Sequence, residues 1–200
     1  MYLIAGLGNP GRKYKHNRHN VGFMLLDRVA GTLGQSFRGF SPNSDIATGV
    51  LAGQKITLLK PLTYMNLSGS SVREIVDYFQ VPVSKCLISY DEVALALGRI
   101  RFRSQGSAGG HKGMQSVIES LETKMIPRLR IGILGDTPRH QLSDYVLNDF
   151  RRAELDMLDE VLDQCLQGIE FFVQHGIEKT MSQFNYFASE KDPDEDREES

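Results

Sequence analysis

Three residues that lie far apart in the sequence, His19, Asp91 and His111, are of the types that carry out acid–base chemistry. His19 follows a glycine-rich turn, Asp91 follows a short apolar run, and His111 lies in the glycine-rich stretch 106–113. A histidine is neutral at pH 7 when its pKa is near its ordinary value of about 6.5. An aspartate bonded to it fixes its tautomer and stabilises the imidazolium that forms. If the fold brings these residues together, His19 would be a general base and Asp91 its orienting carboxylate.

The elements that precede these residues predict how they are positioned. Residues 2–5 form an apolar run bounded by glycines, which is typical of a buried strand followed by a tight turn. Residues 87–90 predict a second short strand, which we expect to end at Asp91. Ligand sites in open α/β sheets lie beyond such strand ends. The polar residues expected there after the first strand are Asn9, His19 and Asn20.

Residues 6–11 also match GxGxxG, the fingerprint of dinucleotide-binding folds. That fingerprint requires a helix that opens at the glycines and an acidic residue at the end of the second strand. Here Pro10 and a charged loop follow the glycines, and Asp27 lies within a helical pattern. The motif therefore favours a tight turn beside some other kind of site.

Two further chemistries are disfavoured by spacing. The histidines His16, His19 and His111 suggest a metal site, but no carboxylate has a matching spacing, so we expect no metal. Neither Cys86 nor Cys165 has a neighbouring histidine, and no GxSxG motif occurs. A nucleophilic side chain is therefore not expected.

The rest of the chain alternates helical and strand patterns. Residues 21–33 have helical spacing with Gly34 as a stop, and residues 36–44 are polar and expected to be irregular. The remaining predictions are a hairpin of strands 46–51 and 55–59, a helix capped by Ser68 or Ser70, strands at 99–103 and 128–134 with alternating arginines, and helices at 114–121, 151–174 and 178–186. These elements predict an α/β fold in which a mixed β-sheet is flanked by helices.

Composition and charge favour one domain followed by a separate tail. Residues 190–200 hold seven acidic and two basic side chains, so we expect a domain at 1–189 and a disordered acidic tail. Of the totals of 25 acidic and 23 basic residues, the rest of the chain holds 18 and 21, and this mildly basic body permits a polyanionic partner. No apolar run is long enough to span a membrane. Two cysteines without a CxxC motif and the lack of a signal-peptide start favour the cytoplasm.

A series of motifs in a fixed order resembles the bacterial peptidyl-tRNA hydrolase family from about Tyr2 to Phe187. The motifs are GLGNPG at 6–11, RHNVG at 18–22, KPLTYMNLSG at 60–69, DE at 91–92, GSAGGHKG at 106–113, RLRIGI at 128–133 and DYVL at 144–147. The resemblance implies a single mixed-sheet domain that hydrolyses the ester between a peptide and the 3′ end of tRNA. It also implies peptidyl-tRNA as partner, no cofactor, and we expect a monomer.

The resemblance assigns roles to individual residues. His19 matches the catalytic histidine and Asp91 the aspartate that orients it. The residues that match the pocket for the peptide and the terminal adenosine, or that lie beside it, are Asn9, Tyr14, Met65, Asn66, His111 and Lys112. An asparagine amide such as that of Asn66 is also a suitable donor to the oxyanion that forms when water attacks an ester.

Two further groups of residues match family features outside this pocket. Arg103 and Arg130 fall where the family places basic residues that bind the tRNA 5′ phosphate. Guanidinium groups suit phosphate because they bind it bidentately, although a solvated strand face would show the same alternation. Residues 144–149 match a mobile cover over the cleft.

The chain departs from the family pattern at two positions. Lys112 stands where asparagine is usual, and Ala94 where an acidic residue is usual. Some relatives on this fold have lost catalysis and bind RNA, so a non-catalytic RNA-binding protein is the alternative. The presence of His19, Asp91 and the two asparagines favours the enzyme.

Overall fold

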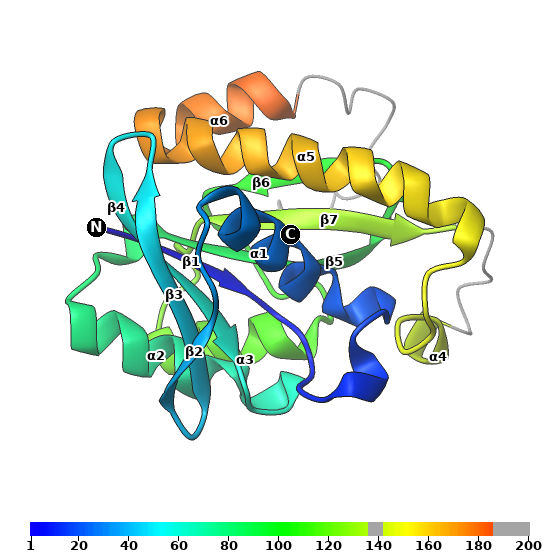
Figure 1. The fold of residues 1–200 in the computed structure, drawn as a ribbon, viewed down its shortest axis with the longest axis horizontal. Helices are drawn as coiled ribbons and strands as arrows, with labels where there is room; N and C mark the ends of the chain where they lie inside the picture. The colour runs from blue at the N-terminus through cyan, green and yellow to red at the C-terminus, as the bar shows by residue number, and fades with distance from the viewer. Residues whose placement is uncertain (136–141, 186–200) are drawn as a thin grey trace, which may run out of the picture.

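A computed structural model describes residues 1–135 and 142–185, and the expected acidic tail lies outside these ranges. Within them, seven strands form one sheet in the order β2-β3-β4-β1-β5-β7-β6 (Figure 1). The strands are β1 Tyr2–Gly6, β2 Arg38–Ser41, β3 Ser44–Leu51, β4 Gln54–Pro61, β5 Cys86–Ala96, β6 Ile100–Arg103 and β7 Arg128–Leu134. The helices are α1 Val21–Thr32, α2 Ser68–Phe79, α3 Lys112–Leu121, α4 Leu142–Tyr145, α5 Arg152–His175 and α6 Ile177–Phe184.

The sheet is mixed, which confirms the expected α/β fold. Strands β4, β1, β5 and β7 run parallel to one another, while the β2–β3, β3–β4 and β6–β7 pairs are antiparallel. After β1 the chain builds β4 on one side of it, and then crosses to build β5 on the other side. The carboxyl end of β1 is therefore the switch point at which sites form in open α/β sheets.

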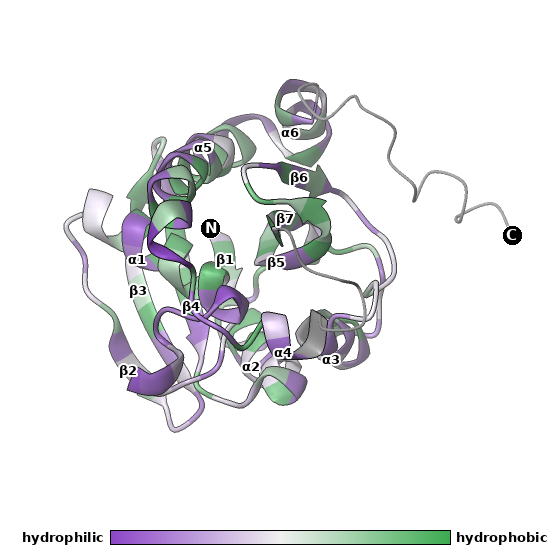
Figure 2. Ribbon diagram, turned by 90° about the vertical axis from the view of Figure 1, so that its right-hand side faces the viewer, coloured by the Kyte–Doolittle hydropathy of each residue, from purple (hydrophilic) through white to green (hydrophobic). Residues whose placement is uncertain are grey.

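Helices cover both faces of the sheet in a three-layer arrangement (Figures 1 and 2). Helices α1, α5 and α6 bury one face around the cluster that includes Ile4, Leu87 and Phe172, and α2 and α3 bury the other around Leu3 and Ile88. Adjacent residues of one strand thus supply opposite cores, as the two-residue period of a strand requires. No helix in the described part of the chain is both long and apolar enough to cross a membrane.

The strongly patterned elements lie close to where the sequence predicts them, and the hairpin does so for a local reason. Strands β3 and β4 are joined by Ala52 and Gly53, which have φ angles of 50° and 75°. A two-residue turn with positive φ at both positions has a backbone twist that matches the twist of the two strands it joins.

Three details of the predicted elements are wrong. Residues 36–44 are not wholly irregular, because Arg38–Ser41 form β2 by pairing with β3 across a register shift. Ser68 and Ser70 do not cap α2, since their hydroxyls donate to carbonyls three residues earlier and Leu67 occupies the cap position. The strand predicted at residues 87–90 does not end at Asp91. It is β5, which continues to Ala96 because β7 pairs with it beyond the end of β1.

The glycines around the first turn allow the start of α1 to contact the sheet backbone. A Cβ at Gly6 would lie 2.3 Å from the Gly22 carbonyl oxygen, and a Cβ at Gly22 would lie 2.6 Å from the Leu7 nitrogen and 2.7 Å from the Ser89 oxygen. No helix opens at residues 6–11, because a 3₁₀ turn at Arg12–Tyr14 follows them and α1 begins only at Val21. These glycines are therefore required for packing, and the geometry of a dinucleotide-binding turn is not present.

The outer edge of β6 is closed by one side chain. The Asn185 Oδ1 accepts the backbone N–H of Phe102, and the Asn185 Nδ2 donates to the Phe102 carbonyl, each at 2.8 Å. The amide thus completes the two backbone bonds that a further strand would make.

We expect alanine at Gly22 and at Gly31, both in α1, to have opposite effects on stability. Gly22→Ala forces a methyl group against three backbone atoms that cannot move aside, and should lower the free energy of unfolding by about 3 kcal/mol or more. Gly31 has no atom within 4 Å of a built Cβ, so Gly31→Ala should raise the free energy of unfolding by up to about 1 kcal/mol. Urea denaturation of both variants measures this, and similar effects at the two positions would contradict the packing role.

Candidate active site

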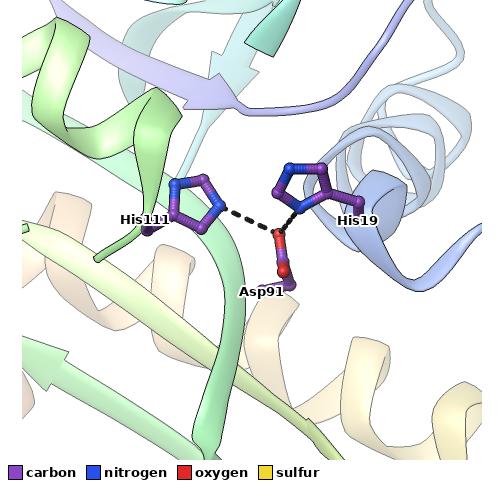
Figure 3. A group of neighbouring side chains, drawn as sticks. All are labelled: His19, Asp91 and His111. Atoms are coloured by element: carbon purple, nitrogen blue, oxygen red, sulfur yellow. Dashed lines mark hydrogen bonds and ion pairs between the residues drawn. The ribbon is translucent and has the colours of Figure 1, made fainter. Parts of the chain in front are cut away.

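His19 is bonded to Asp91 beyond the end of β1. It lies in a 3₁₀ turn, Arg18–Asn20, directly before α1, and its Nδ1 is 2.7 Å from Asp91 Oδ1 (Figure 3). A carboxylate only accepts hydrogen bonds, so the His19 Nδ1 carries the proton and Nε2 keeps its lone pair. The predicted pair of a base and its orienting aspartate is therefore present as a hydrogen-bonded contact.

The position of Asp91 follows from the unequal lengths of two adjacent strands. Strand β1 ends at Gly6, opposite Ser89, whereas β5 continues along β7 with Asp91 opposite Ile131. Asp91 thus projects into the space just beyond β1 and yet is only 3% exposed. Its backbone remains part of the sheet, which fixes the carboxylate more firmly than a loop would.

His111 is bonded to the same carboxylate oxygen from the other face of the sheet. It is the N-cap residue of α3, where its Nδ1 accepts the Met114 N–H at 3.1 Å. Its Nε2 is 3.0 Å from Asp91 Oδ1 (Figure 3), and its ring contacts Tyr90 with centroids 4.7 Å apart. Because Nδ1 accepts a backbone donor, Nε2 must carry the proton and donate to Asp91.

This hydrogen bonding distinguishes the two histidines chemically. Both ring nitrogens of His111 are engaged, Nδ1 as acceptor of the Met114 N–H and Nε2 as donor to Asp91. Among the residues that the structure describes, the His19 ring is hydrogen-bonded through Nδ1 alone, to the carboxylate. His19 is therefore the ring that can take a proton, and His111 serves to fix Asp91.

The two imidazole N–H groups also determine the ionisation of Asp91. Burial by itself would raise the pKa of this carboxyl group, but the interactions with His111 and then His19 outweigh burial and hold its pKa well below the ordinary value. Asp91 is thus a carboxylate at neutral pH and can accept both bonds.

A pair of asparagines fixes the loop between β1 and His19. The Asn20 Oδ1 accepts the Asn9 N–H and the Asn20 Nδ2 donates to the Asn9 carbonyl, each at 2.9 Å. The Asn9 Oδ1 in turn accepts the Met65 N–H at 3.0 Å, which orients the Asn9 amide with its NH₂ group away from Met65. Asn9 therefore connects the loop of His19 to the loop that carries Asn66.

The other residues predicted to contact the substrate differ in how far they are buried. Met65 is 5% exposed and packs in the core cluster beneath α2 and α3, where Gly113 gives its sulfur room. Asn66, one residue on, is exposed, and so is Lys112, the first residue of α3. Tyr14 lies half-buried in the turn ahead of His19, with the Lys13 ammonium over its ring at 4.7 Å.

The predicted phosphate ligands lie on one face of the β6–β7 pair. Arg103 is opposite Arg128, and Arg130 is opposite Arg101, so the four side chains start from the same side of the sheet. Arg130 Nε donates to Glu92 Oε2 at 2.7 Å. Arg128 is 2% exposed and donates to three backbone carbonyls, so it is a structural residue rather than a surface one.

His19, Asp91 and His111 are also the cluster within the described ranges that could hold a metal ion, with ligand atoms within 4.8 Å of one another. The carboxylate that sequence spacing did not supply is Asp91, whereas His16 is exposed and belongs to another part of the loop. The imidazole nitrogens that face Asp91 already donate to it, so a metal would have to displace two protons and the bonds they make.

Some residues that support the site were not given a role from sequence. Asn20 was expected beyond the first strand but without a role, and the place of Glu92 directly after Asp91 is a signal that could indicate it. Tyr90 packs on His111. Arg18 is a buried neighbour of His19 whose partners lie more than 120 residues away in the sequence, so no local pattern indicates it.

Comparison with known proteins gives matches along almost the whole chain. The family model described as peptidyl-tRNA hydrolase matches residues 3–194. The peptidyl-tRNA hydrolase of Gloeobacter violaceus is 45% identical over 199 residues, which cover 96% of this chain and 98% of that protein. That of Carboxydothermus hydrogenoformans is 44% identical over 185 residues, covering 92% and 98%. A solved structure of peptidyl-tRNA hydrolase from Acinetobacter baumannii matches with a TM-score of 0.86 at 32% identity, covering 93% of this chain and 95% of that one.

The depressed pKa of Asp91 predicts a pH-dependent contribution to stability. A carboxyl group whose pKa is lower in the folded state than its unfolded value of about 3.9 stabilises the fold fully above that value, and loses this stabilisation as the pH falls. The difference in free energy of unfolding between the wild type and Asp91→Asn should therefore shrink by at least about 1 kcal/mol from pH 6 to pH 2. Urea denaturation across this range tests it; a difference that stays constant or grows in acid would contradict the assignment.

Proposed function

The chain belongs to the peptidyl-tRNA hydrolase family, a family of ester hydrolases, and from this premise we propose that His19 and Asp91 carry out the reaction. The substrate is the ester between a peptide, or an N-blocked aminoacyl group, and the 3′ end of tRNA, and its hydrolysis recycles the tRNA. One observation carries the proposal: Asp91 engages His19 at Nδ1, which leaves Nε2 as the acceptor for a proton of water.

In the proposed mechanism His19 acts first as base and then as acid. Its Nε2 takes a proton from water as the water oxygen attacks the ester carbonyl carbon. The tetrahedral intermediate then breaks the bond to the ribose 3′ oxygen, and that oxygen receives the proton from the imidazolium. Asp91 stabilises the imidazolium without taking its proton. The products are the free peptide acid and tRNA with its 3′ hydroxyl.

Amide donors suit the negative charge that forms on the carbonyl oxygen. We assign this role to Asn66, which is exposed beside Met65, with Asn9 lining the pocket. The fixed orientation of the Asn9 amide supports its availability as a donor to substrate. One donor to such an oxyanion contributes about 3 kcal/mol to the stability of the transition state.

The mechanism needs no metal or other cofactor, because an aminoacyl ester is activated toward water that a histidine deprotonates. We further propose that the protein acts as a monomer in the cytoplasm, where its tRNA substrate is used.

We also assign Arg103 and Arg130 to binding of the tRNA 5′ phosphate. Their face of the sheet is the one that carries Tyr90, since Tyr90 is opposite Arg130, and the Tyr90 ring contacts His111. A phosphate bound there would lie on the same face as the loop of His111. The Glu92 carboxylate fixes the Arg130 guanidinium by its Nε.

The function is tested with N-blocked aminoacyl-tRNA and free aminoacyl-tRNA as parallel substrates. We expect release from the first and not from the second, unchanged by EDTA. His19→Ala should lower kcat by about 1,000-fold or more while tRNA still binds, and Asn66→Ala should lower it by about 100-fold. Binding of tRNA by the wild type without release would instead favour the non-catalytic RNA-binding alternative, and near-normal release by His19→Ala would rule out its role as base.

The phosphate assignment predicts a loss that depends on the substrate. Arg103→Ala and Arg130→Ala should each raise KM for N-blocked aminoacyl-tRNA by about tenfold and flatten the salt dependence of binding, because one phosphate contact is lost. A short substrate that lacks the 5′ phosphate should show little change. Lys85→Ala, which removes a positive charge directly before β5, is the matched control. Equal losses on both substrates would mean that the arginines are structural.

A further inference from the structure

The backbone of His19 is bonded to a segment far along the chain. The His19 N–H donates to the Val146 carbonyl at 2.8 Å, and the Arg18 N–H donates to the Asn148 carbonyl at 3.1 Å. In return the Phe150 N–H donates to the His16 carbonyl at 3.2 Å. Residues 145–150, which we call the anchor segment, thus lie directly against the turn that carries the proposed base.

The Arg18 side chain fixes this anchor segment. Its guanidinium donates to the Asp149 carbonyl at 2.7 Å, the Asn148 carbonyl at 3.2 Å and the Glu154 carboxylate at 2.7 Å. The same group lies over the Tyr145 ring, 4.1 Å from its centroid. One side chain therefore joins both ends of the anchor segment to the first turn of α5.

Tyr145 connects the anchor segment to the sheet. Its hydroxyl donates to the Ile133 carbonyl at 2.8 Å and accepts the Gly135 N–H at 3.0 Å, at the carboxyl end of β7. The guanidinium of Arg18 thus rests on a ring that is itself fixed to the core of the molecule.

Stability alone does not explain why an arginine is buried at position 18. The side chain is 2% exposed, and its Nε has no hydrogen-bond partner in the described part of the chain. A buried charge with an unsatisfied donor is unfavourable compared with an apolar side chain of similar size. Burial also keeps Arg18 from contacting substrate.

We infer that Arg18 is a positioning residue for the base: by fixing residues 145–150 it fixes the Val146 carbonyl, and through it the backbone of His19. This inference rests on the proposed function of His19. The direction in which the His19 Nε2 points depends on its backbone as well as on the bond to Asp91. Loss of the guanidinium bonds from Arg18 to the anchor segment and to Glu154 should therefore misplace the base relative to the ester. The tRNA-binding residues should stay in place.

The first test compares Arg18→Lys with Arg28→Lys. A lysine at position 18 keeps the charge, but its single nitrogen replaces the two guanidinium nitrogens that reach the two carbonyls and Glu154 from separate positions. Arg28 also joins its helix to α5, by ion pairs with Asp159 and Asp163, but makes them on the exposed side of α1. For N-blocked aminoacyl-tRNA, Arg18→Lys should lower kcat per folded molecule by about 100-fold with KM changed less than about twofold, since misplacement by an ångström has this scale of effect. Arg28→Lys should retain the wild-type kcat.

Glu154→Gln provides a milder variant if Arg18→Lys does not fold. The glutamine retains an oxygen that can accept from the Arg18 guanidinium but has no negative charge. The value of kcat should therefore fall by about tenfold, again with little change in KM. A wild-type kcat per folded molecule in both Arg18→Lys and Glu154→Gln would overturn the inference, as would a rise in KM equal to the fall in kcat.

Amide hydrogen exchange gives a readout that does not depend on activity. In Arg18→Lys, or in Glu154→Gln, exchange of the His19 amide should speed up by at least about tenfold, because its bond to Val146 opens more often, while the Val29 amide within α1 keeps its wild-type rate. An unchanged His19 rate, or an equal increase at both amides, would overturn the inference. If the wild type releases no peptide, the proposed function fails, and the exchange rates still decide whether Arg18 positions this turn.

Discussion

One carboxylate oxygen is the point on which the site depends. Asp91 Oδ1 accepts an imidazole N–H from each face of the sheet, so that His19 from the α1 side and His111 from the α3 side meet at a single atom. Such a meeting point requires that the strand between the two faces extend past its neighbour, which β5 does beyond Gly6. The close contacts of Gly22 with the sheet backbone then bring the His19 turn near enough to reach it. The same oxygen orients both rings, and the Met114 N–H that donates to the His111 Nδ1 is what distinguishes His111 from the proposed base.

The fold could be predicted from the sequence where local pattern and tertiary contacts agree. The arginine-alternating strands have the two-residue period of a strand, and the apolar run at 2–5 and the hairpin are bounded by glycines or turn residues. Strand β2 has no such period, since its residues become a strand only because β3 offers a free edge. The continuation of β5 through Asp91 and Glu92 was also hidden, because polar residues end most strands but here lie where the neighbouring strand has already stopped.

The sequence predicted which residues form the site, but not the hydrogen bonds that join them. Motifs in a fixed order indicated His19 and Asp91, and the structure joins them directly. The same motifs placed His111 near the site without indicating its role, which depends on an N-cap geometry that fixes its tautomer. Residue spacing argued only against a carboxylate that would complete a metal site with these histidines, and Asp91 is nevertheless placed between two of them, because spacing along the chain does not report distance across a sheet. Arg18 was hidden for the same reason, as its partners come from the far end of the chain.

The amide of Asn185 has a consequence for how the molecule meets other copies of itself. An open strand edge is a template on which further strands add, and proteins block it in several ways. Here the block on β6 is chemical, because one side chain occupies the hydrogen-bonding sites of Phe102. At the other edge of the sheet, β2 is irregular in its geometry, since its pairing with β3 shifts register between Gly39 and Ser41. Growth of the sheet from one molecule to the next is thus discouraged at both margins, and a strand rich in arginine can remain at the outside of a protein without recruiting a second protein to its backbone.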